Sequence, residues 1–89
     1  MGKTFKLGKT IIHRNAVGVL NHRDVSYALK RHQNCDWGVD DLLDKEANDA
    51  AVRYKGRILS SYRDSGGTKF FLITDANRKT TRILLADDF

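Results

Sequence analysis

The last third of the chain departs from the helical period of the residues before it, and its composition is typical of β-strands. Three segments rich in β-branched and aromatic residues cover residues 57–64, 69–76 and 80–87. Gly66-Gly67 in the first connection favours a tight hairpin because both residues can take positive φ. Asn77 in the second connection tolerates the same conformation. The pattern predicts three consecutive antiparallel strands, a meander.

Between residues 24 and 54 the apolar positions recur at helical spacing instead. One predicted helix has Asp24 as its candidate N-cap and carries Val25, Ala28, Leu29 and His32 on one face. A second begins at Asp40 or Asp41 and stops before Gly56. Its predicted apolar face consists of Leu43, Ala47, Ala50, Ala51 and Tyr54.

The first 21 residues predict a strand and a short helix. The strand covers residues 4–12, with a bulge at Gly8, and Asn15 is the candidate cap of a helix over residues 16–20 that stops at Asn21. Together the elements predict a single α+β domain over residues 1–89. It is an antiparallel sheet, made of the C-terminal three-strand meander and the N-terminal strand, with two main helices packed on one face.

Charge divides the chain into three zones within a net charge of +5. Residues 1–34 hold seven Lys or Arg residues against Asp24 alone, residues 35–49 hold six acidic residues against Lys45, and residues 50–89 hold eight basic residues against four acidic ones. The basic parts of such a surface attract nucleic acid or an acidic protein. A solvated mixture of charges explains the same counts equally well.

Three features indicate the compartment. No apolar run reaches the roughly 20 residues that a membrane-spanning helix needs. The N-terminal residues lack the apolar core of a signal peptide, and a single Cys fits a reducing environment. We therefore expect a cytoplasmic protein without a membrane partner.

The stretch RHQNCDWGVDD, residues 31–41, holds the only Cys and the only Trp. His32, Cys35 and Asp36 lack the ligand set of a zinc site, so a half-buried packing role is favoured for His32. For Cys35 as a nucleophile, no third group or oxyanion hole is evident. Trp37 is better explained as a large anchor between the two long helices, with Gly38 permitting the turn. No constellation favours an enzyme or a cofactor.

Basic and aromatic residues interleave around the predicted hairpins and are the candidate partner-binding residues. They are Tyr62, Arg63, Lys69, Arg78, Lys79 and Arg82. Cationic and stacking groups together suit nucleic acid or an acidic protein surface. The alternative is that Phe71 and Ile73, or Phe70 and Leu72, pack under the helices while Lys and Arg protect strand edges from aggregation.

A set of residues from His32 onward carries a resemblance to a known group of proteins. The set is His32, Asp36-Trp37-Gly38, Asn48-Asp49, Gly56-Arg57-Ile58-Leu59-Ser60, Tyr62, Gly67, Lys69-Phe70, Ile73-Thr74, Arg78, Thr80-Thr81 and Leu84-Leu85. Through it the chain resembles small uncharacterised "plasmid-related" proteins of bacterial plasmids, phages and integrated elements. The motif of that group runs His, two residues, Gly-Asp-Trp-Gly, and Cys35 stands here where Gly is usual. The resemblance implies a mobile-element protein and brings no catalytic residues with it.

The favoured function is a non-enzymatic binding protein of a mobile genetic element. We expect it to inhibit a host defence system, of the anti-CRISPR or anti-restriction type, by occluding a nuclease complex, because small accessory proteins of such elements often act in this way. The alternative is a small basic nucleic-acid-binding module that uses the C-terminal sheet. The expected partner is a host protein or a nucleoprotein complex, and direct contact with DNA or RNA stays open.

Overall fold

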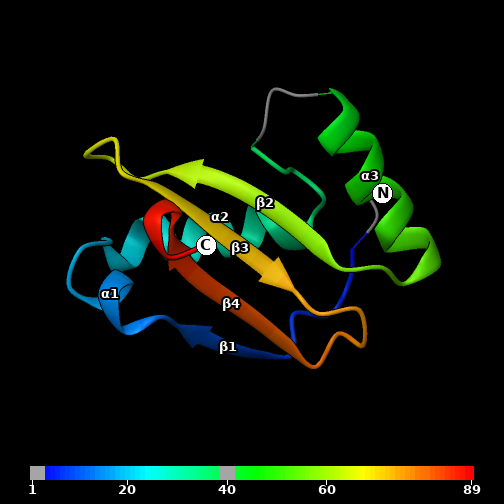
Figure 1. Cartoon of the computed structure of the whole chain (residues 1–89), viewed down its shortest axis with the longest axis horizontal. Helices are drawn as coiled ribbons and strands as arrows, with labels where there is room; N and C mark the ends of the chain where they lie inside the picture. The colour runs from blue at the N-terminus through cyan, green and yellow to red at the C-terminus, as the bar shows by residue number, and fades with distance from the viewer. Residues whose placement is uncertain (1–3, 39–41) are drawn as a thin grey trace.

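The computed structural model describes residues 4–38 and 42–89, which form helices around one sheet (Figure 1). The elements are β1 (Lys9–Ile12), α1 (Arg14–Val17), α2 (His22–Gln33), α3 (Leu42–Tyr54), β2 (Ile58–Arg63), β3 (Lys69–Thr74), β4 (Thr80–Leu85) and the 3-10 turn η1 (Ala86–Asp88). In the described residues, three α-helices and a four-stranded sheet confirm the predicted α+β class. The predicted cap at Asp40 or Asp41 lies outside the described residues.

The strand order is β1-β4-β3-β2, which confirms the predicted meander. β3 pairs antiparallel with both β2 and β4, so that Leu72 lies opposite Ser60 on one side and opposite Ile83 on the other. β1 pairs with β4 in the parallel direction, which makes the sheet mixed where the sequence predicted antiparallel pairing. No tight turn joins these two strands, so nothing local imposes the antiparallel direction.

β1 is shorter than predicted because the chain turns at Gly8 instead of forming a bulge. Gly8 has a φ of +68°, and a Cβ there would lie 2.4 Å from the carbonyl carbon of Lys79. β1 begins directly afterwards, where the Lys9 N–H donates to the Lys79 carbonyl at 2.9 Å. Residues 4–8 therefore form an N-terminal arm outside the sheet, and the Phe5 ring lies 5.1 Å from the His32 ring.

α2 covers one face of the sheet, and Figure 1 shows it running behind the strands. Its predicted inward face is confirmed, because Val25, Ala28 and His32 are buried and Leu29 is half-buried. The helix meets inward side chains of the strands, namely Tyr62, Phe70, Leu72 and Ile83. Burying each large apolar side chain contributes about 1.5–3 kcal/mol. The alternation along β3 thus places Phe70 and Leu72 under α2, and Phe71 and Ile73 on the opposite face.

The helix starts differ from the predicted caps. Asn21, predicted as a stop, caps α2, and its side-chain oxygen accepts a backbone N–H of the first turn at 2.8 Å. Asp24, the predicted cap, lies within the first turn and accepts hydrogen bonds from Ser65 in the β2–β3 connection. The Asn15 cap is also wrong, because His13 caps α1. Asn and Asp are equally good caps, so the sequence alone does not choose between neighbouring candidates.

α3 lies beside the β2 edge of the sheet (Figure 1), and its predicted apolar face is wrong at Ala47, Ala50 and Tyr54. The side chain of Leu43 lies outside the described part of the structure. Tyr54 is 74% exposed and Ala47 and Ala50 are exposed, whereas Asn48 is only 5% exposed. The Asn48 amide donates to the Leu59 carbonyl, and its oxygen accepts the Leu59 N–H at 3.1 Å. These bonds satisfy backbone groups at a strand edge, which explains why a polar residue faces inward.

Trp37 anchors the junction between α2 and α3, as predicted. Its side chain is 3% exposed, and its indole N–H donates to the Asp49 carboxylate at 3.0 Å. Gly38 has a φ of +71°, and a Cβ there would lie 2.4 Å from the Ser61 carbonyl oxygen, so this turn requires glycine. The Ser61 N–H also donates to the Trp37 carbonyl. The junction is thereby joined to β2.

α2 ends in a Schellman motif with Cys35 in the left-handed conformation, at a φ of +64°. The Cys35 N–H donates to the His32 carbonyl at 3.1 Å, and the Asp36 N–H donates to the Arg31 carbonyl at 2.8 Å. A residue with a Cβ adopts this conformation at a cost of about 1–2 kcal/mol, which glycine avoids.

We expect Cys35→Gly to have a free energy of unfolding about 1 kcal/mol higher than that of Cys35→Ala. Both variants remove the thiol, but only the glycine variant removes the Cβ that strains the backbone. Urea unfolding of the two purified variants measures the difference. Equal free energies would show that the backbone at this position carries no strain.

Candidate binding surface

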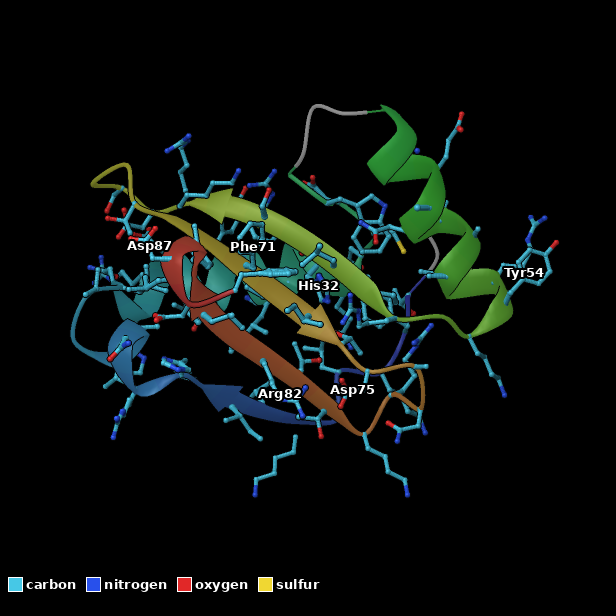
Figure 2. The ribbon with its side chains drawn as sticks, in the orientation of Figure 1. His32, Tyr54, Phe71, Asp75, Arg82 and Asp87 are labelled. Carbon is cyan, nitrogen blue, oxygen red and sulfur yellow. The ribbon has the colours of Figure 1, made fainter. Side chains whose placement is uncertain are left out.

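The sheet face opposite α2 is the candidate binding surface, and we call it the open sheet face. Alternation along the four strands assigns to it Ile11, Arg63, Lys69, Phe71, Ile73, Arg82 and Leu84. Within the described part of the chain no α-helix covers this face, and Figure 2 shows η1 lying in front of the strands beside Phe71. The face is therefore formed by strand side chains and the C-terminal turn.

Aromatic and aliphatic groups occupy part of the open sheet face. The Phe71 and Phe89 rings meet edge to face with their centroids 4.8 Å apart. Phe89 is 54% exposed and Ile11 is 41% exposed. Neither Phe89 nor Ile11 was predicted from the sequence to be a surface residue. Neighbouring residues of a strand point to opposite faces, so one of Ile11 and Ile12 had to face away from the core. Phe89 follows two Asp residues and belongs to no periodic pattern.

Cations adjoin these apolar groups. The Lys69 Nζ lies 5.5 Å from the Phe71 ring centroid, a cation–π arrangement. Arg63 lies directly opposite Lys69 in the β2–β3 register. Arg82 forms an ion pair with Asp75 at 3.1 Å, and Figure 2 shows these two side chains facing one another. The Arg82 charge is thus partly matched, whereas Arg63 and Lys69 form no ion pair with the described residues.

The six predicted binding residues separate into three groups. Arg63, Lys69 and Arg82 all lie on the open sheet face: Arg63 and Lys69 are opposite one another, whereas Arg82 is opposite Ile73, four positions further along β3 from Lys69. Lys79 is exposed in the β3–β4 connection, at the end of the sheet. Tyr62 is buried in the core and Arg78 bonds backbone carbonyls near the end of α3, so neither side chain belongs to the open sheet face.

Tyr62 belongs to the core because it has the opposite parity from Arg63 along β2. It is 5% exposed, and its hydroxyl donates to the Asp36 carbonyl at 2.7 Å. The Arg31 guanidinium lies 4.8 Å from its ring centroid. Burial raises the pKa of the Tyr62 phenol well above its usual value, so the group stays neutral.

Arg78 joins the β3–β4 connection to the end of α3. Its guanidinium donates to the carbonyls of Gly56 at 2.7 Å and Ala51 at 2.8 Å, and to those of Asp75 and Ala76 at 3.1 and 3.2 Å. Partial burial lowers the pKa of Arg78 without removing its charge. Arg78 also takes the left-handed conformation that the sequence had assigned to Asn77, with a φ of +60°.

His32 lies at the centre of a buried polar network that the sequence did not predict. Its Nδ1 is bonded to the Ser60 hydroxyl and its Nε2 to the Thr74 hydroxyl, and Thr74 is bonded to Thr81. The Thr81 hydroxyl donates to the Leu7 carbonyl at 2.7 Å. We call these groups the His32 network. The sequence feature that could have indicated this network is a hydroxyl side chain at an inward position of each meander strand, namely Ser60, Thr74 and Thr81.

The Leu7 carbonyl fixes the direction of the hydrogen bonds that run from Thr81 through Thr74 to His32 Nε2. Since Thr81 gives its only hydroxyl proton to this carbonyl, Thr81 accepts from Thr74. Thr74 in turn accepts from His32 Nε2–H, and His32 Nδ1 accepts from the Ser60 hydroxyl. Because burial keeps the ring neutral at neutral pH, His32 is the Nε2–H tautomer, and its Nδ1 is the acceptor. Burial, and secondarily the charge of Arg78, lower its pKa from 6.5 to about 4.

His32 and Asp36, the residues near Cys35 that were considered as metal ligands, make contacts that stabilise the fold. Asp36 accepts two hydrogen bonds from the Arg31 guanidinium, at 2.8 and 3.1 Å, and this pairing lowers the pKa of the Asp36 carboxyl. His32 is fully buried and bonded to hydroxyls. Among the described residues, no three His, Cys, Asp or Glu side chains gather in a way that could hold a metal ion.

Comparison with known proteins finds no match among protein-family models, curated proteins or solved structures. The resemblance to plasmid-related proteins therefore stays a prediction that rests on the motif residues. In the described parts of the chain, every helix is too short or too polar to cross a lipid bilayer.

We expect Arg78→Ala to lower the free energy of unfolding by about 2–3 kcal/mol, because it leaves partly buried carbonyls without a charged donor. The neighbouring Lys79→Ala serves as the control and should change stability by no more than about 0.5 kcal/mol, since Lys79 is exposed. Urea unfolding measures both. Equal effects would contradict the structural role of Arg78.

Protonation of His32 should destabilise the protein in acid. The folded pKa of about 4 lies below the unfolded value of 6.5, so the unfolded state binds the proton more tightly. Stability is complete above pH 6.5 and falls as the pH drops from 6.5 toward 4, with a total loss of about 3 kcal/mol from this group. Urea unfolding across this range measures the loss. His32→Gln keeps polar contacts without titrating, and an equally steep loss in that variant would assign the effect to other groups.

Proposed function

We propose that this chain is a non-enzymatic binding protein that uses the open sheet face to contact another macromolecule. The observation that carries the proposal is that half-buried Phe71 and exposed Phe89 lie beside Lys69, which forms no ion pair with the described residues, on a face that no α-helix of those residues covers. Phe71, Phe89 and Ile11 supply the apolar area, and Arg63 and Lys69 supply the charge. Apolar area beside arginine is typical of protein interfaces.

We further propose that the partner is a host defence nuclease complex and that the protein inhibits it by occlusion. The resemblance to plasmid-related proteins supports an origin in a mobile genetic element. An occluding inhibitor needs a rigid, charged surface, and strands buried on their inner face provide one. The cations of the open sheet face would be complementary to an acidic patch on such a complex.

A second candidate function is the binding of single-stranded nucleic acid by the same face. The observation that favours it is the Lys69 ammonium beside the Phe71 ring, 5.5 Å from its centroid. Exposed aromatic rings on a sheet can stack on bases while neighbouring cations contact phosphates. This candidate differs from the first in its dependence on salt and on Phe71.

Arg63→Glu/Lys69→Glu should reduce partner binding by at least about tenfold, because two cations become anions at the centre of the contact. The control is Arg53→Glu/Lys55→Glu, which makes the same change in net charge at exposed positions at the end of α3. The readouts are capture of a defence nuclease subunit from host lysate, inhibition of the purified nuclease complex, and the melting temperature of each variant.

Equal capture and inhibition by the two reversed variants would remove the open sheet face from the proposed function. If neither capture nor inhibition occurs with the wild type, the inhibitor proposal is wrong. Binding of single-stranded DNA or RNA that weakens steeply with salt and is lost in Phe71→Ala would establish the second candidate instead.

A further inference from the structure

The side of α2 that faces away from the sheet carries basic groups and one exposed aromatic ring. His22, Arg23, Ser26, Tyr27 and Lys30 line a shallow depression there, and we call them the α2 stripe. Their spacing of i, i+1, i+4, i+5 and i+8 is that of one helix face. Tyr27 is 66% exposed. The stripe belongs to the N-terminal zone, residues 1–34, which contains seven basic residues and one acidic residue.

That acidic residue, Asp24, is held away from the α2 stripe. It accepts hydrogen bonds from the N–H and the hydroxyl of Ser65, at 2.9 and 2.8 Å. These bonds keep the pKa of its carboxyl below the usual value, so its charge is satisfied at the β2–β3 connection. Arg23 and Lys30 form no ion pair with the described residues and remain available to an external anion.

Arg31 follows Lys30 in α2 and helps to position the Tyr27 ring of the α2 stripe. The Asp36 carboxylate fixes the guanidinium by two hydrogen bonds. The same guanidinium lies 5.8 Å from the Tyr27 ring centroid, which favours one placement of that exposed ring. The stripe is therefore partly ordered before any ligand arrives, which lowers the entropy cost of binding.

We propose that the α2 stripe binds duplex DNA, with Arg23 and Lys30 on phosphates. The major groove of B-DNA is about 12 Å wide and admits an α-helix, which measures about 10–12 Å across with its side chains. Double-stranded RNA does not fit in this way, because its major groove is too deep and narrow. At a rise of about 1.5 Å per residue, Arg23 and Lys30 are about 10 Å apart along the helix and contact separate phosphates. Ser26 and Tyr27 add hydroxyl donors between them.

This DNA-binding surface is independent of the proposed function, because α2 and the open sheet face lie on opposite sides of the sheet (Figure 1). A protein with both surfaces can contact a protein on one side and DNA on the other. Such an arrangement suits a partner that is itself a nucleoprotein complex. Variants on the two sides separate the two proposals experimentally.

The test is fluorescence anisotropy of a labelled DNA duplex titrated with the full chain at several salt concentrations. The wild type should bind at low salt, and the slope of log K against log salt should be about −2, as two phosphate contacts require. Arg23→Glu/Lys30→Glu should lose at least about tenfold in affinity with an unchanged melting temperature. Arg53→Glu/Lys55→Glu, with the same change in net charge, and Arg63→Glu/Lys69→Glu should both retain most of the wild-type affinity.

Three results would overturn the inference. The first is the absence of wild-type binding to the duplex at low salt. The second is an equal loss of DNA affinity in Arg23→Glu/Lys30→Glu and in Arg53→Glu/Lys55→Glu, which would show that binding depends only on net charge. The third is retained binding in Arg23→Glu/Lys30→Glu together with lost binding in Arg63→Glu/Lys69→Glu, which would place the DNA on the sheet.

Discussion

The directional hydrogen bonds of the His32 network are the constraint on which the rest of the structure depends. Ser60, His32, Thr74 and Thr81 are all buried, so every polar atom among them needs a partner inside the protein. The network joins α2, three strands and the N-terminal arm, which must therefore reach their places together. Slippage of one strand by a single residue would bury a hydroxyl without a partner, at about 1–3 kcal/mol. The network thus specifies the strand register more sharply than apolar packing alone.

The buried polar groups between α2 and the sheet are satisfied within the protein, and both proposed binding surfaces lie outside this layer. No buried side-chain nitrogen or oxygen of the described residues lacks a hydrogen-bond partner. The groups with unmatched charge, such as Arg23, Lys30 and Lys69, lie outside this layer. The distribution fits a rigid scaffold that presents two different surfaces rather than one that encloses a ligand.

Local patterns in the sequence predicted the meander, the inward face of α2 and the Trp37 anchor, because periodicity and side-chain size decide those features. The direction of β1, the placement of α3 and the role of Arg78 could not be predicted. They depend on backbone groups of distant segments, such as the Leu59 edge that Asn48 satisfies. Three of the six predicted binding residues, Arg63, Lys69 and Arg82, lie on the open sheet face. The sequence marked basic residues without settling which side of the sheet they occupy.

The parallel pairing of β1 with β4 also governs when the fold can be completed during synthesis. β1 precedes the other strands in the chain, yet in the part of the chain that the structure describes it pairs only with β4, and the Thr81 hydroxyl that bonds the arm lies 74 residues beyond Leu7. Contacts of such long sequence separation form slowly, since the loop must close before the contact stabilises it. β1 therefore cannot complete its pairing in the sheet until β4 has been translated.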